Sequence, residues 1–371
     1  TFAVGTPEVL FPIVGESSLL VKNGAEHQRE RKLLMPPFHG SRMRAYGGMI
    51  RDTAREAGQR LQLGEAFRAL DLTQHIAIEV ILRAVFGVVE PRRRERYRHA
   101  IEAFVAAINP LFLLLSSLRS RFFRAWRRFL RARAELDALI YEDIEQRQSA
   151  EPAEDILSLL IASRYDDGSA MTRQELRDEL LTLLFAGHET SAVTIAWALY
   201  ELHRAPQLLQ TLANELDKLP EDSSPDELAR LPYLEAVCNE TLRLHPVVAN
   251  VPKRLTVPMQ LGAYMLPAGT AVTIAYAAVH QRPDLYPEPT RFRPGRFLER
   301  KFGPFEFLPF GGGNRRCLGA AFASYEIKVA LAELIRHYRF RLSGTVPERT
   351  VLRNVTLGPA NGVPMVIEHA S

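Results

Sequence analysis

The stretch "LPFGGGNRRCLG", residues 308–319, decides how this sequence is interpreted. Three glycines and two arginines stand ahead of Cys317, and a segment with helical periodicity, 318–338, follows at once. Loops of this composition cradle phosphates, form structural turns or present metal ligands. The residues around the loop must distinguish these three possibilities.

Two of the familiar interpretations lack their context. Phosphate-binding loops need a preceding buried strand and fixed spacings, whereas no Lys-Ser/Thr pair follows these glycines and no alternating βα pattern surrounds them. A zinc site would need a second pair of ligands nearby, and the sequence has none. A buried cysteine that acts as a small apolar residue is the ordinary alternative.

The spacing Phe310-x-x-Gly313-x-Arg315-x-Cys317-x-Gly319 favours a metal-binding thiolate instead. A cysteine at the start of a helix lies among unpaired backbone N–H groups, which stabilise the thiolate. Glycine at 313 permits a tight bend, and glycine at 319 lets a flat ligand approach the backbone. The guanidinium of Arg315 could bind an anionic group of that ligand.

Composition sets broad limits on the class of protein. The chain has 371 residues, of which 47% are hydrophobic and 24% charged, as in ordinary globular proteins. Its two cysteines, Cys238 and Cys317, argue against a disulfide scaffold. A net charge of +4 permits an acidic partner without requiring nucleic acid. No apolar run reaches the length that spans a membrane.

Helical periodicity dominates the first two thirds of the chain. Helices are predicted at 26–38, 42–61, 72–87, 92–107, 121–148, 154–164, 172–205 and 318–338. The pattern over 172–205 is unusually long and apolar, which indicates a central helix. Short β-like runs separated by proline and glycine follow residue 244 and recur at the end. The predicted fold is mainly α with a small β portion, in one compact unit.

The loop resembles the haem-binding loop of the cytochrome P-450 haem-thiolate monooxygenases. That resemblance implies haem b held between the long central helix and the cysteine loop, with the thiolate of Cys317 as the axial iron ligand. It also implies that Phe310, Arg315 and Gly319 contact the cofactor. Three further segments agree with the family.

The first is "AGHETS", 186–191, a polar interruption in the long apolar helix. Gly187 leaves room near the backbone, and Thr190 can donate a hydrogen bond to the carbonyl of Ala186 and bend the helix. A packing glycine beside a satisfied threonine is the structural alternative. The resemblance implies that Glu189 and Thr190 are a catalytic acid–alcohol pair that lines the oxygen pocket and relays protons.

The second is "NETLRLHP", 239–246, where Glu240 and Arg243 share one helix face. Alone, such a pair is an abundant surface feature. The resemblance implies that Arg296 of "FRPGRF" completes an ion-pair scaffold.

The third concerns the two haem propionates, which need cationic donors. His27 and Arg31 lie four apart on one predicted helix, and Arg254 follows the Glu-x-x-Arg helix. With Arg315, these are the expected propionate partners, although each could be a solvated surface charge.

The resemblance runs from about residue 20 to the end, so we expect one haem-thiolate domain over 1–371 whose opening part is missing or disordered upstream. It implies a soluble, cytoplasmic, bacterial monooxygenase related to fatty-acid and terpene hydroxylases. NAD(P)H would supply electrons through a ferredoxin or flavodoxin and its reductase, which Arg29, Lys32 and Arg316 could attract. We expect a monomer that binds no nucleic acid.

Candidate pocket residues are nearly all apolar, which predicts a hydrophobic substrate: a fatty-acid-like chain, a terpene, a polyketide or a drug-like compound. They comprise Phe11, Ile13, Val14, Phe185, Ala186, Val248 to Val251, Thr356 and Leu357. A haem-thiolate lyase or isomerase, or a non-enzymatic haem-based ligand binder, is the alternative function. The ligand binder would not need the threonine at 190, whereas a lyase or isomerase would use no external electrons and usually departs from the "AGHETS" pattern.

The segment "RSRFFRAWRRFLRAR", 119–133, has seven arginines and no acid. It resembles the family's mobile lid in position, with a solvated basic face. Contact with a membrane surface is the second interpretation, and nucleic-acid binding the third.

Overall fold

The computed structural model describes residues 2–5, 7–38, 41–109, 111–112, 115–120, 122–151, 153–353 and 355–370. The chain forms two compact units, each assembled from three separated stretches. The first unit comprises Thr1–Pro37, Ile81–Ala186 and Val251–Ile274, and the second comprises Phe38–Val80, Gly187–Asn250 and Ala275–Ser371. The prediction of a single domain therefore stays a prediction.

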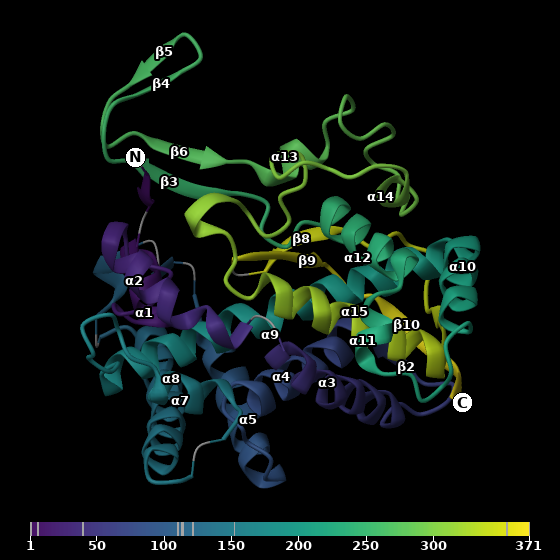
Figure 1. The fold of residues 1–371 in the computed structure, drawn as a ribbon, viewed down its shortest axis with the longest axis horizontal. Helices are drawn as coiled ribbons and strands as arrows, with labels where there is room; N and C mark the ends of the chain where they lie inside the picture. Colours follow the sequence, from purple (N-terminus) through teal and green to yellow (C-terminus); the bar gives the residue numbers. More distant parts are fainter. Residues whose placement is uncertain are drawn as a thin grey trace. The chain divides into compact units, whose positions relative to one another are not determined.

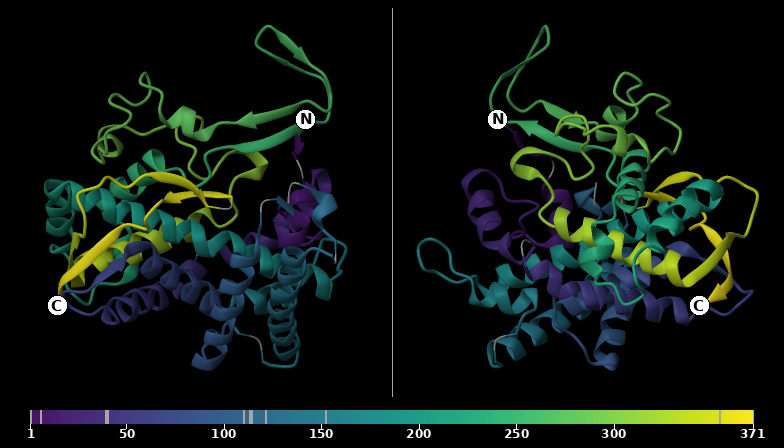
Figure 2. Two further views of the ribbon diagram at one scale, coloured as in Figure 1. Left: turned by 180° about the vertical axis from the view of Figure 1, so that it is seen from behind. Right: turned by 45° about the vertical axis from the view of Figure 1, so that its right-hand side comes forward.

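The first unit combines helices with a small antiparallel sheet (Figure 1). Its helices are α1 (Pro7–Val14), α2 (Gly24–Leu34), α5 (Pro91–Ala107), η2 (Ser116–Leu118), α7 (Arg124–Gln148) and α8 (Ile156–Ala162). Its strands are β1 (Phe2–Val4), β3 (Val251–Leu255), β4 (Met259–Leu261), β5 (Tyr264–Leu266) and β6 (Ala271–Ile274). The sheet has the order β1-β3-β6, and the β4–β5 hairpin projects away from β3 and β6 in all three views (Figures 1 and 2).

The second unit contains the cysteine loop and the helices around it. Its helices are α3 (Ser41–Gln59), α10 (Pro206–Leu216), α11 (Pro225–Ala229), α12 (Pro232–Leu244), α13 (Tyr276–His280), α14 (Arg296–Glu299), η3 (Gly313–Arg315) and α15 (Ala320–His337). Its strands are β2 (Ala66–Arg68), β7 (Tyr338–Leu342), β8 (Thr350–Arg353), β9 (Thr356–Pro359) and β10 (Pro364–Ala370). Strands β2, β10 and β7 form an antiparallel sheet, and β8 pairs with β9 as a hairpin.

Three helical segments cross from one stretch to the next: η1 (Pro36–Phe38), α4 (Ala69–Ala84) and α9 (Arg173–Arg204). Helix α9 is the long helix that the apolar pattern over 172–205 predicts. It is helical throughout, and residues 191–202 are all buried. A helix that is apolar around its circumference lies in a core, so this part of α9 is a central core helix of the second unit.

Helix α15 is the second central element of this unit. It packs against α3 and also contacts α10, α11 and α12. Its side chains from Tyr325 to Ile335 are almost all buried. The cysteine loop enters α15 directly, so this packing fixes the end of the loop. The predicted fold class, mainly α with a small β portion, is confirmed.

Candidate active site

The cysteine loop is a tight turn closed by its own backbone. The N–H of Cys317 donates to the carbonyl of Phe310 at 2.9 Å, and Gly313 has a φ of +61°. Such a φ suits glycine, which confirms the bend predicted at 313. Gly311 is also left-handed, at +69°, and a Cβ there would lie 3.1 Å from the hydroxyl oxygen of Tyr276. The loop therefore places Cys317 two residues before Gly319, the N-cap of α15.

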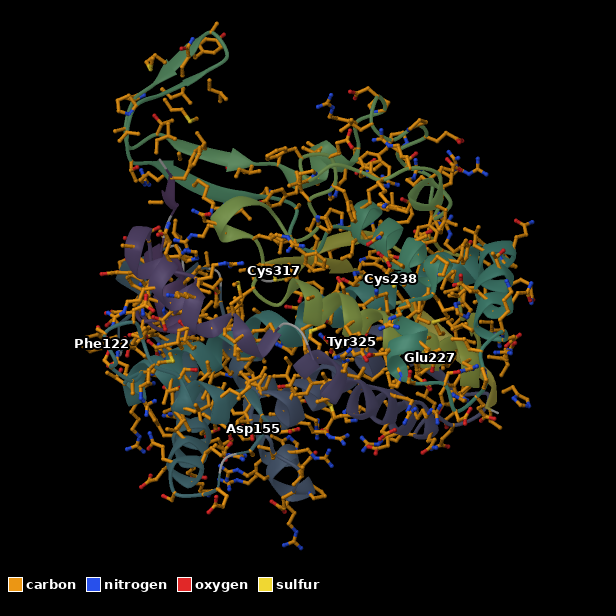
Figure 3. The ribbon with its side chains drawn as sticks, in the orientation of Figure 1. Phe122, Asp155, Glu227, Cys238, Cys317 and Tyr325 are labelled. Atoms are coloured by element: carbon orange, nitrogen blue, oxygen red, sulfur yellow. The ribbon has the colours of Figure 1, made fainter. Side chains whose placement is uncertain are left out.

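The two cysteines have opposite environments. Cys317 is exposed on the loop that precedes α15, whereas Cys238 is buried in α12 (Figure 3). Burial raises the pKa of the Cys238 thiol to about 12, which keeps it protonated. Only Cys317 combines exposure with a helix start, so it is the thiol available as a ligand.

A buried histidine anchors the start of the loop. The N–H of Leu308 donates to Nε2 of His280, the last residue of α13, at 2.9 Å. Burial and the positive charge of Arg243 lower the pKa of His280 to about 4, so the ring is neutral and Nε2 is an acceptor. No signal in the sequence indicated this contact, because 28 residues separate the partners.

The acid and alcohol residues of "AGHETS" lie on α9. Glu189 is buried, and its Oε1 lies 3.7 Å from Nε of Arg353, the last residue of β8. Thr190 is half-buried, and its carbonyl accepts a hydrogen bond from the hydroxyl of Thr194 at 2.9 Å. The predicted bond from the Thr190 hydroxyl to Ala186 stays a prediction. Arg353 is a partner of Glu189 that the sequence did not indicate.

The next residue on α9 connects it to α15. The hydroxyl of Ser191 donates to Oε2 of Glu326 at 2.6 Å, and Oε1 of this carboxyl has no hydrogen-bond partner among the described residues. Burial raises the pKa of Glu326 to about 8, so the carboxyl is protonated at neutral pH. The contact fixes α9 at Thr190 against the helix that follows Cys317.

The predicted ion-pair scaffold is confirmed. Arg243 Nε lies 2.7 Å from Glu240 Oε2, and Arg296 Nε lies 3.0 Å from Oε1, with all three side chains buried. Arg243 also donates to the carbonyls of His280 and Pro289, at 2.9 and 2.8 Å. Buried charges require such complete pairing, which joins α12 to the segments that precede the cysteine loop.

The propionate candidates of the first unit have different surroundings. On α2, His27 is buried and Arg31 is half-buried. On β3, the guanidinium of Arg254 donates to the carbonyls of Gly269 and Gly5, at 2.8 and 3.4 Å. Successive side chains alternate along a strand, so Lys253 faces the opposite side of the sheet.

The basic face predicted to attract a redox protein is partly neutralised. Arg29 lies 2.7 Å from Asp167 and Lys32 lies 2.7 Å from Asp166, and all four side chains are exposed. Arg316, on the cysteine loop, is exposed as well. Exposed pairs of this kind contribute little energy and are broken readily by a partner of opposite charge.

The predicted site residues fall into two groups. Cys317, Phe310, Arg315, Gly319, Glu189 and Thr190 all belong to the second unit, and His27, Arg31 and Arg254 belong to the first. Among the pocket candidates, Ile13 and Val14 are fully buried in the first unit, which favours a packing role. Ala186 is exposed and Phe185 half-buried, although the flanking turns of α9 are largely covered.

These surroundings fit a flat cofactor such as haem. The Cys317 thiol is exposed, and a Cβ placed on Gly313 or Gly319 would meet no atom within 4 Å. Midway along α9, Ala186 and Thr190 are not buried, whereas Ser191 and the residues after it are. Uncovered surface of this kind on a core helix leaves space for a large ligand.

Comparison with known proteins identifies the class. A family model described as "Cytochrome P450" matches residues 9–363. "Putative cytochrome P450 135B1" of Mycobacterium tuberculosis is 38% identical over 361 residues, covering 95% of this chain and 75% of the relative. "Putative cytochrome P450 138" of the same organism is 37% identical over 360 residues, covering 95% of this chain and 79% of the relative.

Solved structures agree with this result. The structure described as "Retinoic acid bound cyanobacterial CYP120A1" matches with a TM-score of 0.89 and 26% identity, over 100% of this chain and 85% of that one. The cytochrome P450DA heme domain matches with a TM-score of 0.87 and 21% identity, over 98% and 82%, which supports the fold. The chain belongs to the cytochrome P450 family, which supports a haem-thiolate monooxygenase in general.

Proposed function

We propose that this protein inserts one atom of O2 into a hydrophobic small molecule. NAD(P)H would supply the electrons through a ferredoxin or flavodoxin and its reductase. The observation that carries the proposal is that one unit contains both an exposed Cys317, just before α15, and the residues Glu189 and Thr190 on α9. We infer a bacterial enzyme, because the curated relatives are bacterial, and we propose that it is monomeric and cytoplasmic.

The roles of the residues follow from their chemistry. Haem, when bound through the Cys317 thiolate, supplies dioxygen activation. The hydroxyl of Thr190 can hold a proton or a water on the uncovered side of α9. Arg353, the last residue of β8, lies 3.7 Å from the carboxylate of Glu189, and we assign to Glu189 the exchange of protons with the oxygen site. Phe310 and Gly319 would contact the ring, while Arg315, His27, Arg31 and Arg254 would bind the propionates.

We infer the substrate class from the candidate pocket residues that remain uncovered. Phe185, Ala186, Val248 and Leu357 are apolar residues that are not buried by other parts of the chain. The N–H of Leu357 donates to the carbonyl of Val247 at 2.8 Å, so β9 and the segment after α12 form one wall. An apolar wall favours a terpene, a fatty-acid-like chain, a polyketide or a drug-like compound. The retinoic acid in the similar cyanobacterial structure is of this kind.

The threonine at position 190 distinguishes the proposed monooxygenase from the two alternative functions. A haem-thiolate lyase or isomerase consumes no external electrons, and a non-enzymatic ligand binder transfers no protons. Neither requires a hydroxyl at position 190. A monooxygenase needs a controlled proton supply, because misdirected protons release reduced oxygen in place of product.

Replacing Thr190 by Ala should therefore uncouple electron use from oxygenation. With any substrate that the unmodified enzyme oxidises, we expect the variant to keep consuming NAD(P)H. The product formed per electron should fall about tenfold, and the yield of peroxide should rise. The measurement is product formed per NAD(P)H consumed, with a surrogate ferredoxin and reductase.

Thr194→Ala is the matched control on the same helix. Thr194 is buried one turn further along α9, and its hydroxyl is committed to the carbonyl of Thr190. Its coupling should stay near that of the unmodified enzyme. Unchanged coupling in the Thr190 variant would refute the assigned proton role.

A further inference from the structure

The turn before α7 exposes large apolar side chains. Phe122 is 94% exposed and Phe123 is 44% exposed, and Phe122 is labelled in Figure 3. Leu111 and Leu115, which precede this turn, are also exposed. Single exposed apolar residues are common in soluble proteins, but two adjacent aromatic rings are a feature that needs a partner.

A stripe of arginines begins directly after these rings. Arg124, Arg127, Arg128 and Arg131 stand at positions i, i+3, i+4 and i+7 of α7, so they occupy one helix face. All four are exposed, and within the described part of the chain no carboxylate pairs with any of them. We call these four residues the arginine stripe. No acid occurs between Glu102 and Glu135.

The opposite face of α7 is buried, which keeps the arginine stripe at the surface. Phe129 is fully buried and packs on Phe104 of α5, with ring centroids 5.5 Å apart. Phe112 packs on both Trp126 and Phe129, at 5.2 and 5.1 Å. This aromatic cluster attaches the start of α7 to the first unit, so the arginine stripe cannot turn inward.

The position of the stripe is electrostatically unfavourable for an isolated protein. The first turns of a helix carry a partial positive charge, which favours acidic side chains there. The first turn of α7 contains no acid. An external polyanion would relieve this repulsion.

We propose that the arginine stripe, with Phe122 and Phe123, binds the surface of an anionic lipid bilayer. Guanidinium groups bind lipid phosphates, and aromatic rings enter the boundary between headgroups and acyl chains. The combination of exposed rings with unpaired arginines favours a bilayer over nucleic acid, which would use the charges but not two adjacent apolar rings. Among the described helices none is long and apolar enough to cross a membrane, and the proposed contact requires none.

The test is flotation of the full chain, loaded with haem, with vesicles. One set contains phosphatidylglycerol and phosphatidylcholine in equal amounts, and the other contains phosphatidylcholine alone. We expect the protein to float with the anionic vesicles and to be released by high salt. Each arginine contributes about a fivefold gain in binding, so replacing all four by Gln should weaken it on the order of several hundredfold.

Replacing Phe122 and Phe123 by Ser should weaken vesicle binding about tenfold or more while leaving the salt dependence intact. Phe305→Ser is the matched apolar control, because Phe305 is 83% exposed elsewhere on the chain.

The charge control replaces four other exposed arginines by Gln. These are Arg68, Arg282, Arg291 and Arg341, each of which is paired with a carboxylate. If vesicle binding is lost equally in this control and in the stripe variant, net charge alone explains the loss, and the proposal is overturned.

Three other results would overturn it. They are no flotation with anionic vesicles at low salt, equal flotation with both vesicle types, and retained flotation after loss of the stripe. Tight binding of duplex DNA without vesicle binding would assign the stripe to nucleic acid. Circular dichroism and the spectrum of the haem-loaded variants establish that each variant is folded.

Discussion

His280 is the residue whose titration most directly concerns the cysteine loop. Its pKa is lowered from 6.5 to about 4 by burial and by Arg243, so between these values the unfolded chain binds the proton more readily than the folded chain. Stability therefore falls as the pH drops from 6.5 to 4. Protonated Nε2 could no longer accept the N–H of Leu308.

Replacing His280 by Leu should lower the free energy of unfolding by about 1–3 kcal/mol at pH 7, because the Leu308 N–H loses its acceptor. The deficit should shrink at about pH 5, where the unmodified protein has already lost stability. Urea unfolding at pH 7 and at about pH 5 measures this deficit. His99→Leu, at an exposed histidine, is the control. A deficit that is equal at the two pH values would contradict the assignment.

Glu326 should show the opposite pH dependence. Burial raises its pKa from 4.5 to about 8, so the folded chain retains a proton that the unfolded chain releases, and stability falls as the pH rises through this range. Glu326→Gln keeps the shape and still accepts the Ser191 hydroxyl. As the pH rises from about 5 to about 8, the unfolding free energy of the variant should increase relative to that of the unmodified protein by about 2–4 kcal/mol.

Thermal or urea unfolding across this pH range provides the comparison. The exposed Glu56→Gln on α3 is the control and should show no pH-dependent gain. A constant difference between the Glu326→Gln variant and the unmodified protein would mean that Glu326 is ionised in the folded state.

At the scale of elements, α7 depends on its aromatic cluster. Phe129 is fully buried among Phe104, Phe112 and Trp126. Phe129→Ala should cost about 3–5 kcal/mol of unfolding free energy, the usual range for deleting a buried ring. Phe122→Ala, on the exposed turn before α7, should change it by less than about 0.5 kcal/mol. Similar losses in the two variants by urea unfolding would show that the cluster does not hold α7.

Long, strongly periodic elements could be predicted well from the sequence. The helix predicted over 172–205 is α9, Arg173–Arg204, and that predicted over 318–338 is α15, Ala320–His337. The helix predicted over 26–38 was too long, because α2 ends at Leu34 before the prolines at 36 and 37. Several short helices escaped prediction, since one or two turns carry little periodicity.

The site was predictable where motifs are local. The loop and the Glu240–Arg243–Arg296 scaffold follow from segments that can be recognised in the sequence. The contacts His280–Leu308, Ser191–Glu326 and Glu189–Arg353 could not be predicted, because packing alone brings these distant residues together.

At the scale of the whole molecule, the cysteine loop and the proposed acid–alcohol pair belong to one unit. Cys317, Glu189 and Thr190 all lie in the second unit, where α9 and α15 are joined through Ser191 and Glu326. His27, Arg31 and Arg254, the expected partners of the propionates, belong to the first unit, as do the residues of the arginine stripe. Proton delivery and bilayer binding are therefore proposed for residues of different units, and separate variants can test them.

The absorption spectrum of the reduced protein with carbon monoxide tests the central claim, that Cys317 is the thiolate ligand of haem. The unmodified protein and Cys238→Ala should give the strongly red-shifted Soret band of a thiolate opposite carbon monoxide, and Cys317→Ser should lose it. A red-shifted band that survives in Cys317→Ser, or no haem spectrum from the unmodified protein after haem supplementation, would contradict the account.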